Sequence, residues 1–136
     1  MSRARHRRSL RPAAFALAAF SAVAIAACGD SGGGGGSSYK EPKGPAQETI
    51  TVKGGNFFFD PKDIEAPAGV VAIKLESEGG LHDLVFDDDK VPGFKLEASS
   101  GKSDELKVNL KPGKYTIYCD IPGHREAGME GTLTAT

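Results

Sequence analysis

The feature that most constrains the fold is an alternation of apolar and polar side chains that recurs through residues 49–136. Such short alternating runs are typical of β-strands with one buried face. Glycine and proline pairs between the runs indicate turns, and no stretch shows a helical period. The alternating apolar positions are Ile50 and Val52; Phe57 and Phe59; Val71, Ile73 and Leu75; Leu84 and Phe86; Leu106, Val108 and Leu110; Tyr115 and Ile117; and Leu133 and Ala135. The pattern predicts an all-β sandwich or barrel of seven or eight strands.

The first 48 residues lack this alternation and divide into two parts. Residues 1–12 are basic, and residues 13–27 are uncharged and apolar. This arrangement is typical of a secretory signal, and the apolar run is shorter than the roughly 20 residues of a spanning helix. Residues 28–48 are rich in Gly, Ser and Pro, which predicts a flexible tether. We therefore expect a signal at 1–27, a tether at 28–48 and one folded domain at 49–136.

The end of the apolar run carries a lipidation signal. Ile25-Ala26-Ala27-Cys28 resembles the lipobox of bacterial lipoproteins. The resemblance implies cleavage before Cys28 and attachment of a diacylglycerol to its sulfur. The alternative is an ordinary cleaved signal followed by a chance cysteine. Lipidation would place the domain outside the cytoplasm, anchored to the outer face of the membrane or on its periplasmic side.

The charge balance excludes one class of partner. Removing the five arginines of residues 1–27 from the 17 basic residues leaves 12 against 18 acidic ones, a net charge of −6. A nucleic-acid-binding domain would need a basic face instead. We therefore expect no nucleic-acid partner.

The chain after the tether contains one Cys, two His and one Met. They are His82, Cys119, His124 and Met129, of which the last three lie within eleven residues. Each alone would be an ordinary packing or surface residue. A free thiol in an exported protein is open to oxidation, however, and metal coordination would give Cys119 a reason to stay unpaired.

The donor set selects the metal. One thiolate and two imidazoles with a weak axial thioether is the arrangement of blue-copper sites. Structural zinc favours more Cys or His ligands, and calcium and magnesium favour oxygen. The set therefore predicts one mononuclear copper ion.

Two segments resemble the cupredoxins, the type 1 blue copper family. Tyr118-Cys119-Asp120-Ile121-Pro122-Gly123-His124, followed by Ala127-Gly128-Met129, resembles their ligand loop. Its spacing is similar to that of auracyanin and sulfocyanin, whereas plastocyanin has a shorter gap between Cys and His. The segment from Phe59-Asp60-Pro61 to Gly69 resembles the front half of the family. The resemblance implies a Greek-key β-sandwich with one type 1 copper, used for single-electron transfer.

The resemblance also implies a role for each residue of the site. His82 matches the first ligand, Cys119 and His124 match the second and third, and Met129 matches the axial ligand. The family often has Asn after the first His, where it ties the two ligand loops together, but this chain has Asp83. An ionised carboxylate only accepts hydrogen bonds, so the hydrogen bonds of that Asn, and the potential they help to set, do not carry over from the family to Asp83.

By the same resemblance His124 is the ligand nearest solvent and the port for electrons. Pro122, Gly123 and Ala127 would form a small apolar docking patch around it. The acidic run of Asp87, Asp88 and Asp89 follows His82 at a distance similar to the docking patch of plastocyanins. It would steer a basic partner such as a cytochrome, and the alternative is a solvated turn.

Four functions can be ranked on these grounds. The first is a monomeric, membrane-tethered electron carrier that serves a cytochrome or a membrane oxidoreductase. The second is a copper storage or delivery module, although the chain lacks Met-rich or His-rich tracts. The third is a copper enzyme, which would need additional His ligands, and we expect no enzyme. The fourth is a copper-free interaction domain, which would not need all four ligands.

Overall fold

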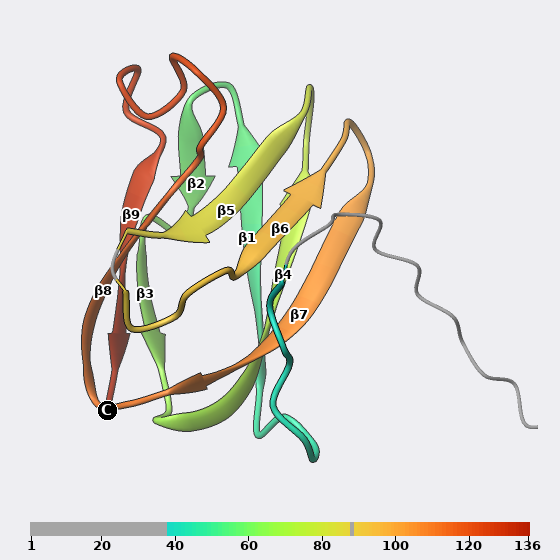
Figure 1. Ribbon diagram of the computed structural model, residues 1–136. Helices are drawn as coiled ribbons and strands as arrows, with labels where there is room; N and C mark the ends of the chain where they lie inside the picture. The colour runs from blue at the N-terminus through green and yellow to red at the C-terminus, as the bar shows by residue number, and fades with distance from the viewer. Residues whose placement is uncertain (1–37, 88) are drawn as a thin grey trace, which may run out of the picture. The chain divides into compact units, whose positions relative to one another are not determined.

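The computed structural model describes residues 38–87 and 89–136 (Figure 1). The signal at 1–27, Cys28, the first part of the tether and Asp88 lie outside the described residues. Nine strands form in the described part, and no helix there is long and apolar enough to cross a membrane. The strands are β1 (Thr49–Gly55), β2 (Phe58–Asp60), β3 (Asp63–Ala66), β4 (Gly69–Ser77), β5 (His82–Phe86), β6 (Lys95–Ala98), β7 (Ser103–Leu110), β8 (Gly113–Tyr118) and β9 (Glu130–Ala135).

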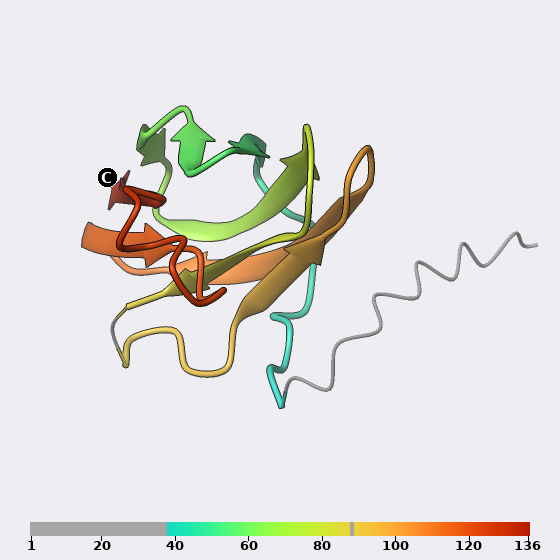
Figure 2. The same ribbon diagram turned by 90° about the horizontal axis from the view of Figure 1, so that it is seen from above.

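The strands form two sheets, in the orders β2-β1-β4-β7 and β3-β9-β8-β5-β6. The pairs β1–β4 and β3–β9 are parallel and the others are antiparallel. Seen from above, the sheets are two curved layers (Figure 2). The predicted Greek-key β-sandwich is confirmed. The described residues form nine strands, however, where the pattern predicted seven or eight. The two without a counterpart among the alternating runs are β3 and β6, which have four residues each and therefore too few alternating positions to stand out.

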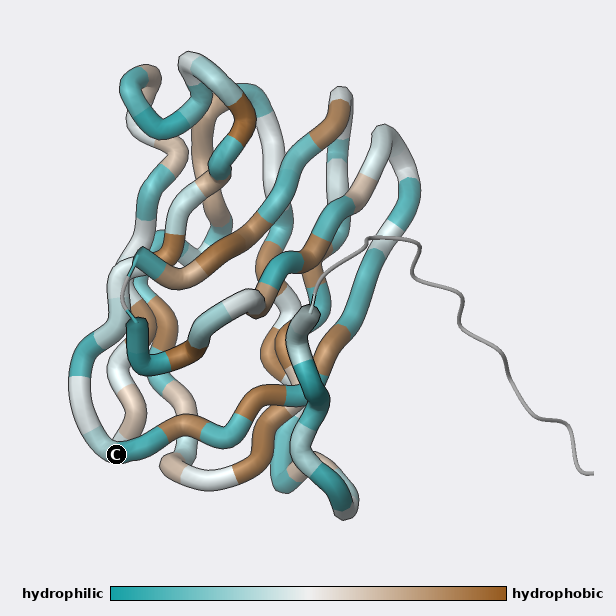
Figure 3. Tube along the Cα trace, in the orientation of Figure 1, coloured by the Kyte–Doolittle hydropathy of each residue, from teal (hydrophilic) through white to brown (hydrophobic). Residues whose placement is uncertain are grey.

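The core lies between the two sheets. Hydrophobic and hydrophilic positions alternate along most strands (Figure 3), and the hydrophobic ones face the opposite layer. Val52, Leu75, Leu84, Ile117 and Leu133 are completely inaccessible to solvent. Burial of these side chains therefore accounts for the sequence pattern.

Several connections lie at one end of the sandwich, at the top of Figure 1. They are the β1–β2 turn, the β4–β5 connection, the β6–β7 turn and the long β8–β9 loop. The β8–β9 ladder pairs Tyr118 with Glu130, so both ends of the loop are held side by side. This end of the sandwich carries the candidate site.

Residues 38–48, which the sequence predicts to be flexible, contain no helix or strand but are attached to the domain. The Tyr39 hydroxyl donates a hydrogen bond to the Lys107 carbonyl over 2.8 Å, and the Tyr39 ring packs edge-on against Phe94. The Glu41 carboxylate accepts a hydrogen bond from the Lys107 backbone N–H. In this part of the predicted tether, contacts with β7 and Phe94 therefore limit the freedom of the chain.

Gly131 of β9 provides a test of the packing below the site. A Cβ added at Gly131 would lie 2.5 Å from the carbonyl oxygen of Lys62, which is backbone and cannot turn away. We expect Gly131→Ala to lower the free energy of unfolding by about 1–3 kcal/mol, the usual cost of overpacking. Chemical denaturation of the metal-free protein would measure it. Gly79→Ala is the control, because no heavy atom lies within 4 Å of its added Cβ; equal stability of the two variants would contradict the prediction.

Candidate metal centre

His82, Cys119 and His124 come together although 37 residues separate the first two in sequence. His82 begins β5, Cys119 directly follows β8, and His124 lies in the β8–β9 loop. One ligand atom from each lies within 4.8 Å of the others. His82 and Cys119 are buried and His124 is half-buried, so the cluster has one side near solvent.

The ring of His82 is oriented with one nitrogen free. Its Nε2 lies 2.7 Å from the Gly79 carbonyl oxygen, and because a carbonyl only accepts, Nε2 carries the proton. Nδ1 then has a lone pair, yet it is buried and has no hydrogen-bond partner among the described residues. A buried acceptor without a partner is costly, and a metal ion would satisfy it.

Cys119 lies between the two histidine-bearing segments. Its Sγ is 3.4 Å from Nδ1 of His124 and accepts a 3.5 Å hydrogen bond from the backbone N–H of Asp83. It is a free thiol with no exposed surface. Burial raises the pKa of this thiol above its ordinary value, so the metal-free protein holds it protonated at neutral pH.

Met129 closes the loop that starts at Cys119. The Cys119 N–H donates to the Met129 carbonyl, and the Met129 N–H donates to the His124 carbonyl, each over 3.0 Å. The Met129 side chain is completely buried. A Cβ added at Gly54 would lie 3.3 Å from Met129 Cε and 3.4 Å from His82 Cβ. Because Gly54 has no side chain, the side chains of Met129 and His82 can both pack against its backbone.

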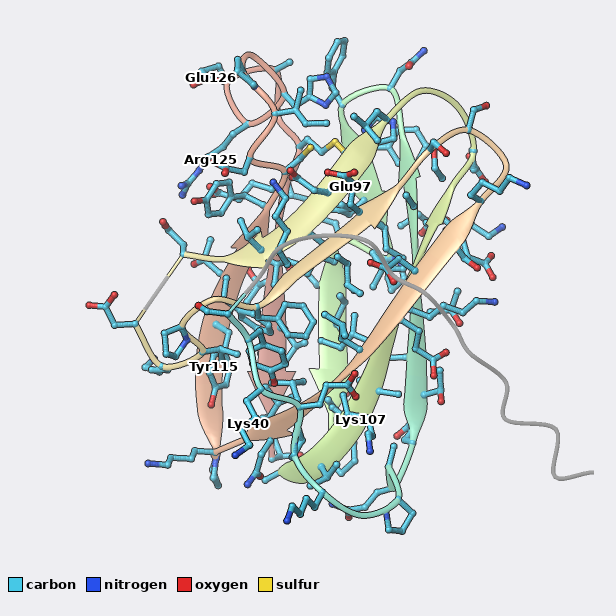
Figure 4. The ribbon with its side chains drawn as sticks, turned by 45° about the vertical axis from the view of Figure 1, so that its right-hand side comes forward. Lys40, Glu97, Lys107, Tyr115, Arg125 and Glu126 are labelled. Atoms are coloured by element: carbon cyan, nitrogen blue, oxygen red, sulfur yellow. The ribbon has the colours of Figure 1, made fainter. Side chains whose placement is uncertain are left out.

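The loop from Cys119 to Met129 is stabilised by turns and by Arg125. Gly123 and Gly128 adopt positive φ values of 85° and 110°, which favour glycine. The Arg125 guanidinium forms two hydrogen bonds with Asp87, at 2.7 and 3.1 Å, and a third with Glu130. Figure 4 shows Arg125 and Glu126 on this loop, at the end of the sandwich away from Lys107. Arg125, the neighbour of His124, thus links the loop to Asp87, the residue that follows β5.

Asp83, predicted to lie next to the site, is almost completely buried. Its Oδ1 accepts a 2.5 Å hydrogen bond from the Asp120 backbone N–H, and its Oδ2 lies 2.7 Å from the Lys95 ammonium. Asp83 therefore links the segments of His82 and Cys119. No local pattern in the sequence indicates that Lys95 contacts Asp83, and only the structure shows this contact.

The predicted docking residues lie on the surface. Pro122 and Ala127 are exposed. Asp87 and Asp89 are also exposed, but Asp87 is engaged by Arg125, which holds the pKa of its carboxyl below the ordinary value. At least one carboxylate of the acidic run is therefore neutralised within the protein.

Three exposed apolar residues beside the site were not predicted. Phe57, Phe58 and Leu81 are 46%, 43% and 47% exposed and are the large exposed hydrophobic residues of the described chain. Phe57 contacts His124 edge-on, with ring centroids 5.2 Å apart. The run of three phenylalanines was the available signal for Phe58, since a strand buries only alternate positions and Phe59 is the buried one. Alternation would place Phe57 on the same face as Phe59, but Phe57 precedes β2 and has a positive φ of 63°, so it does not follow the strand pattern.

Comparison with known proteins identifies the family. A family model for copper binding proteins of the plastocyanin/azurin family matches residues 46–136. A chloroplastic plastocyanin of Physcomitrium patens is 36% identical over 86 residues, covering 57% of this chain and 50% of its own. A plastocyanin of Scenedesmus fuscus is 34% identical over 98 residues, covering 62% of this chain and 97% of its own. The chain spans about half the length of the first of these relatives.

Two solved structures share the fold. Auracyanin B has a TM-score of 0.61 and 23% identity, covering 74% of this chain and 96% of its own. The reduced auracyanin of Roseiflexus castenholzii has a TM-score of 0.57 and 20% identity, covering 68% and 99%. The chain is a cupredoxin and belongs to the plastocyanin/azurin family of copper binding proteins. Its cofactor is copper, and His82, Cys119, His124 and Met129 form a type 1 copper-like site.

The buried thiol predicts proton release on metal binding. Because burial raises the pKa of Cys119, the thiol is protonated before copper binds, and coordination requires the thiolate. We expect about one proton to leave the Cys119 thiol for each Cu(II) bound at neutral pH. The affinity for Cu(II) should therefore rise about tenfold per pH unit. Calorimetry in buffers of different ionisation enthalpy would count the protons, with Cys119→Ser as the control. Release that does not differ between the two proteins would contradict the protonated thiol.

Proposed function

We propose that this chain is an electron carrier that holds one copper ion and exchanges single electrons with redox partners outside the cytoplasm. The ligands would be Nδ1 of His82, Sγ of Cys119, Nδ1 of His124 and the thioether of Met129. One observation carries the proposal: the buried, unpartnered Nδ1 of His82 lies in a cluster with Cys119 and His124 whose ligand atoms are within 4.8 Å of one another. A free thiolate with two imidazoles suits copper better than zinc.

When bound, copper would supply a one-electron couple between Cu(I) and Cu(II). The residues of the chain would keep the ligand positions similar in both oxidation states. The Gly79 carbonyl fixes the His82 ring, and the backbone bonds among Cys119, His124 and Met129 fix the loop. Small ligand movement means a small cost of reorganisation at each electron transfer. Both histidines after residue 28 are used in the site, which leaves none for a second copper centre of an enzyme.

The exchange of electrons would take place at His124. This histidine is the half-buried member of the cluster, and Phe57 contacts its ring. Phe57, Phe58 and Leu81 would extend the docking patch predicted at Pro122 and Ala127. An apolar patch suits the brief, weak encounters of redox proteins, which bury little surface.

The acidic run would contribute less to docking than its sequence suggests. Asp87 is bound by Arg125, so its charge is compensated at the surface. Asp89 remains exposed, and Asp88 lies outside the described residues. Steering of a basic cytochrome would then depend on the overall negative charge of the chain after residue 27 more than on Asp87.

The N-terminal region would place the carrier at a membrane. Cys28, in its lipobox-like segment, would carry the lipid, and the glycine-rich stretch after it would provide reach. Because residues 39–44 contact β7, the flexible part of the tether would end before the domain itself begins. Copper storage or delivery remains the alternative, and it would suit a site that releases its metal more readily.

The spectrum of the copper-loaded protein tests the proposal. With one equivalent of Cu(II), we expect an intense blue sulfur-to-copper absorption band and a narrow copper hyperfine splitting in electron paramagnetic resonance. Cys119→Ser should abolish the band because the thiolate supplies it, whereas Cys28→Ser should retain it. A colourless protein, or the pale spectrum of ordinary Cu(II), would overturn the electron-carrier proposal and favour copper handling.

A further inference from the structure

A carboxylate occupies a position next to the site where a net charge is costly. Asp83 follows His82 directly, and its side chain is 2% exposed. A buried carboxylate without a counter-charge is strongly unfavourable, and its field would reach the neighbouring metal site. The chain must therefore compensate the charge of Asp83.

Lys95 supplies the compensation from a different strand. The β5–β6 register pairs Asp83 with Glu97 and Val85 with Lys95, so Lys95 is the diagonal neighbour of Asp83 on the same face. Long side chains reach across such diagonals, and the Lys95 ammonium lies 2.7 Å from Asp83 Oδ2. The hydrogen bond to Asp83 raises the pKa of Lys95, so the cation is maintained across the neutral range.

The other carboxylate oxygen of Asp83, Oδ1, accepts a hydrogen bond at a position where the β5–β8 ladder has no backbone pair. β5 pairs with β8 only at Val85–Tyr118 and Phe86–Ile117. Continuing that register would place Asp83 opposite Asp120, where the ladder has ended. There the Asp83 carboxylate accepts the Asp120 N–H, and the Asp83 N–H donates to Cys119 Sγ. Asp83 thus joins β5 to the start of the ligand loop through both its backbone and its side chain.

We propose that Asp83 and Lys95 form an ion-pair clamp that positions the Cys119 loop against β5 and sets the charge experienced by the copper site. Lys95 is a positioning residue, since it acts through Asp83 and contacts no ligand. The ion pair would make this link electrically neutral overall while keeping a full acceptor for the Asp120 N–H. The part of the inference that concerns the copper rests on the proposed function.

A double-mutant cycle in metal-free protein tests the clamp independently of copper. The variants are Asp83→Asn, Lys95→Met and their combination, in the full chain with Cys28→Ser as the common background. Lys95→Met leaves the carboxylate buried without its partner. We expect the folding equilibrium constant to fall on the order of tenfold, less than for a fully buried pair because Lys95 is 40% exposed. Adding Asp83→Asn should restore most of the loss, since Asn still offers an oxygen to Asp120 and carries no charge.

The reduction potential of the copper-loaded variants provides the second readout. Removing the cation favours the more positive Cu(II) state, so Lys95→Met should lower the potential. Asp83→Asn should raise it, and the double variant should return close to the parent value. Lys102→Met is the matched control, because Lys102 is exposed and forms no ion pair within residues 38–87 and 89–136.

Two results would overturn the clamp. The first is Lys95→Met behaving like Lys102→Met in stability, with no rescue by Asp83→Asn. The second is rescue of stability with no shift of potential, which would show that the pair supports folding but does not set the charge experienced by the copper site. Absence of the blue band in the parent protein is a different failure: it would contradict the proposed function, while the metal-free cycle would still decide the clamp.

Discussion

The pairing of β8 with β9 is the interaction on which the site depends. Their ladder runs from Gly113–Ala135 to Tyr118–Glu130, and the hydrogen bond from the Cys119 N–H to the Met129 carbonyl adds one further step. The two sulfur-bearing residues are therefore fixed opposite each other by the backbone. The loop between them can vary in shape only within this constraint, and His124 lies midway along it.

The ligands gather where the sheet opens. β5 leaves β8 after two residue pairs, and the space between the separating strands receives the side chains of the site. A hydrogen bond from the Asp83 N–H to Cys119 Sγ takes the place of the ladder, and the His82 ring donates its Nε2–H to the Gly79 carbonyl. The result is a buried set of donors in which one nitrogen and one thiol have unused coordinating capacity. Among the described residues, the other buried polar side-chain atoms already have hydrogen-bond partners, so a metal ion could bind here without rearranging the fold.

The sequence predicted the sheets and the donor set for different reasons. Strand periodicity is local, so runs such as Val71–Leu75 stood out, whereas the four-residue β3 and β6 did not. The donors stood out because soft ligands are scarce in this chain. Lys95 could not be predicted, because its contact with Asp83 depends on the β5–β6 register, which no local pattern encodes. The contacts of Tyr39 were missed for the same reason, since composition describes a segment and not its neighbours.

The hydrogen bonds around His82, Cys119 and Met129 hold the ligand positions before the metal arrives. Crystal structures of the metal-free, Cu(I) and Cu(II) forms would test this most directly. We expect His82 Nδ1, Cys119 Sγ and His124 Nδ1 to stay within about 0.5 Å of the same positions in all three forms, which is the tolerance of a well-supported site. A β8–β9 loop that is rearranged in the metal-free form, or a ligand exchanged between Cu(I) and Cu(II), would contradict it.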